Sequence, residues 1–223
     1  MMRRRIIHVI LFLAILAAVL YSPLTSYLLK DFLTFKLEKA LGMDIVLGKA
    51  RLKFPVRVTI SDLKVIDKKS IAISAETAYF QLDMSRLLQA KVVLKCDIRN
   101  VSIKSGFCNS LNGLLKPLGV PPQDNYLFED INGTITTKKS FFSVDDLKGY
   151  GQNFRFSGYF KRYEGNKVDC DIEFDISKQV LKADEDKSGM FVAGEAKNGW
   201  YSTRLSLKKG PDGFKLEVRP GTN

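Results

Sequence analysis

The pattern of hydrophobic and polar residues divides the chain into an apolar run, an amphipathic helix and a series of strands. The apolar run covers residues 6–21 and can be extended to residue 29. Extended in this way, it reaches the ~20 residues that a membrane-spanning helix needs. Residues 26–41 place apolar side chains at helical spacing and end at Gly42, which predicts an amphipathic helix with a glycine at its C-terminal end. Such a helix could cap the end of a sheet, lie at a membrane surface, or do both.

From residue 44 onward, apolar and polar residues alternate, which is the period of β-strands. The alternation slips by one residue near Asp62 and again at Asn100, and a β-bulge is the usual cause of such a slip. Residues 105–130 are irregular and rich in glycine and proline, so we expect a connector there, with one helical turn at 111–118 packed on the sheet edge. The pattern predicts a mainly β protein built as a long antiparallel meander.

The register of two strands can be derived from their side chains. In these two strands, apolar residues lie opposite apolar residues only if the sequence numbers of the two residues in each pair add up to an even total. A total of 330 sets Phe160 opposite Cys170 and Lys161 opposite Asp169, whereas the next candidate register sets two lysines against each other. The first register is therefore favoured. It leaves residues 164–166 as a three-residue loop in which one residue needs a positive φ.

The strand pattern continues to the C-terminus. Asn198 and Gly199 predict a hairpin turn between strands at 190–196 and 200–207. The expected organisation has four segments: residues 1–25 form a basic tip and a membrane anchor, 26–104 a helix followed by strands, 105–130 the connector, and 131–223 a second antiparallel β portion.

The N-terminal apolar run favours an uncleaved anchor over a cleaved signal peptide. Three arginines in front of it predict that the N-terminus stays in the cytoplasm while the rest crosses the membrane. A signal peptide has the same charged start and apolar run, but bulky residues follow Ala17 and Ala18, so no clean A-x-A cleavage site is present. The residues assigned to the anchor are Arg3, Arg4, Arg5, Ile6, Leu11, Phe12, Leu16 and Leu20.

Composition narrows the classes of function. The formal net charge of +11 is spread over the whole chain, which is typical of a solvated basic face and would also favour contact with anionic membranes. Nucleic acid is not an expected partner, because the anchor would place the basic portion outside the cytoplasm. The only histidine, His8, lies in the anchor, so histidine-based acid–base catalysis and histidine metal ligands are excluded for the exported part.

The remaining candidate chemistry is also weak. The chain has three cysteines that are far apart and form no C-x-x-C, which indicates neither a zinc site nor a disulfide framework, although one pair could be bridged in an oxidising compartment. Acidic residues at every second position of one strand spread over roughly 20 Å, too far for one metal or catalytic cluster. We expect this stripe to face Arg155 and Lys161 on the solvated side; it comprises Asp169, Asp171, Glu173 and Asp175. No catalytic residue, metal or cofactor is predicted.

The succession of segments over residues 27–104 resembles the N-terminal module of AsmA-like proteins, the bacterial relatives of TamB and of chorein-type bridge-like lipid transporters. The resemblance rests on the order of four phrases: LGMDIV, then ISDLKV, then SRLLQAK, then VVLKCDIRNVSI. It implies a non-enzymatic, single-pass protein of the bacterial inner membrane, with its bulk in the periplasm. Such a protein would bind or transfer lipid, with phospholipid as the expected ligand, in outer-membrane biogenesis.

The resemblance implies that the sheet curls into an open, taco-like groove for acyl chains; if the sheet instead folds over itself, the same residues form an ordinary core. The expected groove residues are Phe54, Val56, Val58, Val92, Leu94, Phe154, Phe156, Phe160, Ile172 and Phe174. About a dozen strands give a groove of roughly 60 Å at most, which is short for bridging two bilayers. Other envelope proteins or further copies of the chain are therefore expected partners. The alternative is a secretion-system-like assembly subunit whose sheet binds protein; an exported enzyme is third.

Overall fold

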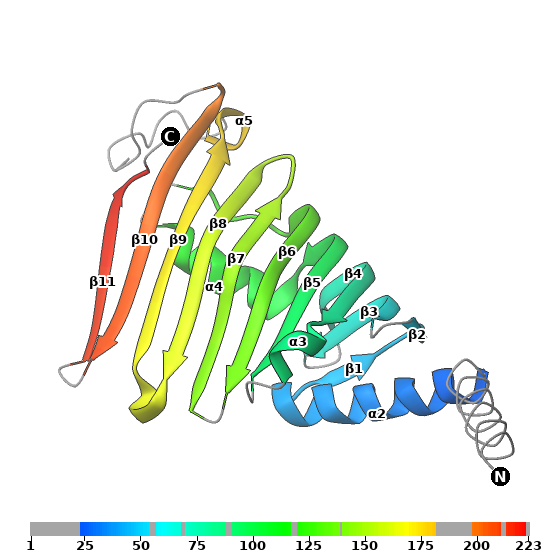
Figure 1. Ribbon diagram of the computed structural model, residues 1–223. Coiled ribbons are helices and arrows are strands. Elements are labelled where there is room, and N and C mark those ends of the chain that lie inside the picture. The colour runs from blue at the N-terminus through cyan, green and yellow to red at the C-terminus, as the bar shows by residue number, and fades with distance from the viewer. Residues whose placement is uncertain are drawn as a thin grey trace, which may run out of the picture.

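A single antiparallel sheet forms the body of the protein (Figure 1). The computed structural model describes residues 23–53, 57–67, 70–87, 91–116, 120–138, 140–181, 198–210 and 213–221. The strands are β1 (Asp44–Val46), β2 (Lys49–Lys53), β3 (Arg57–Asp67), β4 (Ser70–Leu82), β5 (Val92–Ile103), β6 (Tyr126–Lys138), β7 (Phe141–Tyr150), β8 (Phe154–Tyr163), β9 (Val168–Ser177), β10 (Trp200–Gly210) and β11 (Gly213–Pro220). From β3 to β11 each strand pairs with the next in the chain, and β1 and β2 both pair with β3. The predicted mainly β meander is confirmed, and the sheet is open.

The helices are short apart from two. They are α2 (Pro23–Leu41), α3 (Met84–Leu87), α4 (Ser105–Leu115), α5 (Lys178–Leu181) and the 3-10 turn η2 (Glu164–Asn166). The helix α2 ends as predicted at Gly42, which adopts φ +66° and donates its N–H to the carbonyl of Glu38 at 2.8 Å. Figure 1 shows α2 beside β1 and β2, and α4 behind the strands in the middle of the sheet.

All the residues assigned to the membrane anchor lie outside the described residues, which begin at Pro23. Within the described ranges, no helix combines the length and the apolar character that a membrane span requires. The anchor therefore stays a prediction.

The derived register of β8 and β9 is confirmed. Phe160 pairs with Cys170 and Lys161 pairs with Asp169. The loop between the strands is the three-residue turn η2, in which Gly165 adopts φ +75°. The positive φ falls on a glycine, where it causes little strain.

The two predicted slips in the alternation are present, but their cause differs from the one expected. Asp62 and Asn100 each adopt φ +52°, a conformation that Asp and Asn tolerate better than most residues. On both sides of Asp62 the pairing keeps the same register, with Ser61 opposite Thr77 and Leu63 opposite Ala75. A local left-handed residue thus reverses the two faces without an inserted residue. Register shifts of the bulge type occur instead between Val65 and Ile66 in β3 and around Asp146 (φ +52°) in β7.

The strand predicted at 190–196, and with it that side of the predicted hairpin, lies outside the described residues. Asn198 and Gly199 do form a turn, with φ +51° and +84°. The strand β10 pairs with β9 from Trp200 to Lys209 and with β11 from Thr203 to Gly210. The turn lies beside the end of β9, because the N–H of Lys178 donates to the carbonyl of Gly199 at 3.0 Å.

The core lies on one face of the sheet and is covered by α2 and α4. The cluster beneath α4 consists of Ala75, Val101, Cys108, Leu115, Val120, Tyr126, Phe128, Phe154, Ile176 and Val180. The cluster beneath α2 consists of Ile45, Leu47, Ile60, Val65 and Ala78. Leu63, Ile73 and Ile98 pack against both clusters, which makes the two helices neighbours on the same apolar face. The expected single turn at 111–118 is thus an eleven-residue helix that lies on the face of the sheet, not at its edge.

Candidate functional site

Four of the eight predicted groove residues that the structure describes do not line an open groove. Phe54 and Val56 lie outside the described residues. Val58 packs against the core beneath α2. Three phenylalanines belong to the core beneath α4 or pack against it: Phe154, Phe156 and Phe174. Where these four described side chains lie, the apolar face is an ordinary protein core.

The other four predicted residues, Val92, Leu94, Phe160 and Ile172, are absent from both core clusters of the described residues. Two of them belong to a continuous row of directly paired residues, one from each strand from β5 to β10. This open apolar row consists of Leu94, Ile135, Val144, Phe160, Cys170 and Leu207. Directly paired residues in an antiparallel sheet point to the same face, so the six side chains lie side by side.

Every residue of the open apolar row is only partly buried. Val92 lies beside it with 37% of its surface exposed, and Phe142 with 38%. The Phe142 ring lies 6.2 Å from the Phe160 ring, centroid to centroid. Five strand spacings give the row a length of about 24 Å, compared with roughly 15 Å for the acyl layer of one membrane leaflet. The row is therefore long enough to hold an extended acyl chain across the strands.

The cysteines on this face behave as apolar side chains. All three cysteines of the protein are free. Burial raises the pKa of the Cys170 thiol in the open apolar row, and burial likewise raises the pKa of Cys96. A thiol with a raised pKa stays protonated and unreactive at neutral pH. The Cys96 thiol donates to the carbonyl of Gly133 at 3.1 Å.

The boundary of the open apolar row is set by α4 and the segment that follows it. The side-chain amide of Asn112 donates to the carbonyl of Gln123 at 2.8 Å and accepts the N–H of Gln123 at 2.9 Å. The same oxygen accepts the hydroxyl of Tyr126 at 2.7 Å, and the thiol of Cys108 donates to the Gln123 carbonyl at 2.9 Å. Tyr126 is 1% exposed, and its burial raises the pKa of its phenol to about 12. These bonds hold α4 and the connector over one half of the apolar face.

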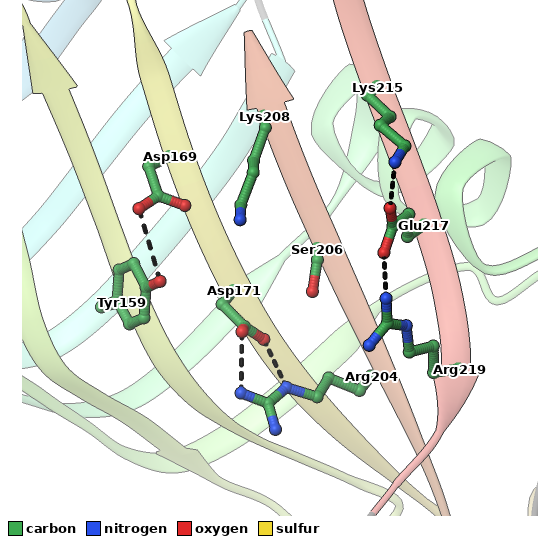
Figure 2. Close-up of a pocket in the computed structure, with 9 residues that line it drawn as sticks. All are labelled: Tyr159, Asp169, Asp171, Arg204, Ser206, Lys208, Lys215, Glu217 and Arg219. Carbon is green, nitrogen blue, oxygen red and sulfur yellow. Dashed lines mark hydrogen bonds and ion pairs between the residues drawn. The ribbon is translucent and has the colours of Figure 1, made fainter.

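The opposite, polar face carries a hollow of about 330 Å³ between β8 and β11 (Figure 2). Arg204 makes a two-pronged ion pair with Asp171, with both N–O distances at 2.7 Å. This pairing lowers the pKa of the Asp171 carboxyl. Glu217 lies between Lys215 and Arg219, at 2.6 and 2.5 Å. The charges that line the hollow thus largely neutralise one another.

The acidic stripe on β9 lies on this polar face, where Asp175 pairs in register with Arg155 and Asp169 with Lys161, as expected. The ammonium of Lys161 is 3.5 Å from Asp145 on β7, although Lys161 pairs in register with Asp169. The guanidinium of Arg155 stacks 4.0 Å above the Trp200 ring. Diagonal neighbours are within reach of long side chains, so register alone does not decide ion pairs. Among the described residues, no group of His, Cys, Asp and Glu side chains could hold a metal ion.

Sequence reasoning missed Asn112 and Arg204. Asn112 sits in a helix whose Phe107, Cys108, Leu111 and Leu115 recur at helical spacing, a signal that could have predicted α4. Arg204 could have been predicted to face Asp171 only with β10 placed directly beside β9. No family model matches the chain, and the search of curated proteins found no match either.

Proposed function

We propose that the protein is a non-enzymatic lipid-binding protein that holds an acyl chain along the open apolar row. The observation that supports this best is the row itself, in which six paired strands present apolar side chains that neither α2 nor α4 covers. Apolar patches of this kind on a soluble surface are typical of binding sites. We propose a single acyl chain, because the rest of the apolar face is filled by the cores.

The setting that we propose for this activity follows the AsmA-like resemblance. The N-terminal apolar run tethers the protein to the bacterial inner membrane, with the sheet in the periplasm, and the ligand is a phospholipid of the envelope. A row of about 24 Å is too short to bridge two membranes, so the protein would present lipid locally or hand it to a partner. Lipid extraction and partner exchange would thus both take place at one short site.

The decisive experiment is native mass spectrometry with lipid extraction on the full-length protein purified in mild detergent. Leu94→Asp places a charge in the open apolar row and should abolish co-purification of phospholipid. Leu127→Asp is the matched control, because Leu127 is 57% exposed and pairs with Ser102, outside the apolar face. It should leave the bound lipid unchanged. A wild-type protein that carries no lipid, or equal loss in both variants, would contradict the proposal.

The alternative, an assembly subunit whose sheet binds protein, is favoured by one observation. The described sheet ends at β11, whose outer edge has no neighbouring strand among the described residues. An exposed strand edge can pair with a strand of another protein. Under this alternative, Leu94→Asp and Leu127→Asp would leave complex formation intact, and proline substitution in β11 would abolish it.

A further inference from the structure

The helix α2 carries a second apolar side that faces away from the sheet. Its inner side packs against the core through Leu33 and Leu37. At 100° per residue, Leu28 and Phe35 lie on the opposite side of the helix, with Phe32 next to them. These three, which we call the outer stripe, are 62%, 60% and 56% exposed. A helix that only covers a sheet has one apolar side and a polar one, so the outer stripe is not explained by packing on the sheet.

The position of the outer stripe along the chain indicates what covers it. The apolar run of residues 6–21 ends just before α2, which begins at Pro23. The helix rises about 1.5 Å per residue, so Phe35 lies roughly 18 Å along α2 from Pro23, two residues after the end of this run. If the run spans the bilayer, as in the proposed function, α2 starts at the membrane surface. Phenylalanine and leucine on one side of a helix are typical of helices that lie in the interface between lipid headgroups and acyl chains.

Two residues near the outer stripe agree with this setting, and the exposed Asp31, one turn before Phe35, marks its border toward water. Lys39 is exposed and lies on the same side of α2, one turn beyond Phe35. A lysine at the border of an interfacial helix can extend its ammonium toward lipid phosphates. Tyr27, 68% exposed, stands at the start of the helix, where an aromatic ring with a polar end is typical of the membrane–water boundary.

We infer that the outer stripe of α2 lies in the lipid interface of the membrane that the N-terminal run crosses. The helix is then shared between two surfaces, with Leu33 and Leu37 on the sheet and Leu28 and Phe35 in lipid. This would fix the end of the sheet that carries β1 and β2 at the membrane, with the remaining strands leading away from it. The inference rests on the membrane tether of the proposed function, but not on lipid binding by the open apolar row.

Fluorescence quenching on the full-length protein tests this placement. Trp200 is the only tryptophan, so Trp200→Phe gives a background without indole emission. In that background, Phe35→Trp should lose about half of its emission in vesicles whose phospholipids carry bromine in the upper acyl chain, because interfacial helices bury their apolar side there. The matched control is Leu127→Trp, a similarly exposed position on β6, whose emission should stay unchanged. Circular dichroism confirms that both variants are folded.

Each other outcome overturns the inference. Emission typical of water without quenching would place the outer stripe in solvent. Emission typical of an apolar site without quenching would mean that protein covers it, either residues 6–21 or a second copy of the chain. Flotation of the same protein with vesicles tests the tether separately, and lipid extraction tests the open apolar row. A failure of the proposed function is thereby distinguished from a failure of this inference.

Discussion

Replacing Asn112 with alanine should loosen α4 from the sheet. The Asn112 amide connects the helix to the connector and to the first residue of β6 through three hydrogen bonds, two with Gln123 and one with Tyr126. Without it, the Gln123 N–H and the Tyr126 hydroxyl lose the partners described above. The Gln123 carbonyl keeps the thiol of Cys108, so two polar groups are left unsatisfied rather than three.

The expected loss of stability follows from this count. A buried polar group left without a partner costs about 1–3 kcal/mol, and Tyr126 is almost fully buried while Gln123 is half-buried. We therefore expect Asn112→Ala to lower the free energy of unfolding by about 2–4 kcal/mol, a large part of the total for a protein of this size. Tyr126→Phe removes the hydroxyl but leaves Asn112 bonded to Gln123, so it should cost only about 1 kcal/mol.

Urea unfolding of the full-length protein in mild detergent, followed by circular dichroism, measures these differences. In the Tyr126→Phe background, Asn112→Ala should cost about 1–2 kcal/mol less than in the wild type, because no hydroxyl is then left unsatisfied. Asn109→Ala is the control, since Asn109 is exposed on the same helix. If Asn112→Ala destabilises no more than Asn109→Ala, or if the two sites prove additive, the assigned role of Asn112 is refuted.

Three further predictions follow from single positions. A methyl group on Gly158 would lie 2.0 Å from a backbone oxygen, whereas one on Gly113 meets nothing within 4 Å. Gly158→Ala should thus cost more than about 2 kcal/mol, and Gly113→Ala should stabilise α4 by about 0.5–1 kcal/mol, both measured by urea unfolding. Arg204→Gln should remove the main cause of the lowered pKa of Asp171. In the wild type, the ion pair of Asp171 stabilises the fold above the usual pKa near 3.9, and this stabilisation is lost as the pH falls through the lowered pKa. The free energy of unfolding of the variant should therefore be lower by roughly 0.5–1 kcal/mol at pH 7 and should change less on acidification to pH 3 than that of the wild type. Burial of Tyr126 raises its pKa to about 12, so the protonated phenol contributes stability that is fully present below pH 10 and is lost as the pH rises through about 12. Unfolding curves measured over a series of pH values should therefore show a smaller loss of stability at alkaline pH for Tyr126→Phe than for the wild type.

The strands and one register could be predicted because two independent requirements agreed. In β8 and β9, the register that matched apolar residues also matched opposite charges, and Phe160 indeed pairs with Cys170. The reversals of face at Asp62 and Asn100 were visible as breaks in the alternation. However, the alternation of apolar and polar residues indicates only which face of the sheet a side chain occupies, and not which backbone conformation places it there. From the sequence alone, the left-handed conformations behind these breaks therefore cannot be distinguished from bulges.

The cover over the apolar face could not be predicted in the same way. The segment that forms α4 contains Gly106, Asn109, Asn112 and Gly113, all of which have low helix propensity. Its helical structure depends on packing against strands that are distant in the sequence. Without α4, sequence reasoning could not separate the half of the predicted groove that is filled, as at Phe154, from the half that is open.

The order of strands in the sheet has a consequence for how such a protein can change in length. Because each strand from β4 to β11 pairs only with its neighbours in the chain, the sheet resembles a one-dimensional array in which stability is approximately a sum of nearest-neighbour terms. Duplication or loss of one hairpin would leave all other strand pairs in place and would change the array by two spacings, about 9.6 Å. Evolution could thus lengthen this surface in steps of one hairpin added beyond β11, which leaves the cores beneath α2 and α4 in place.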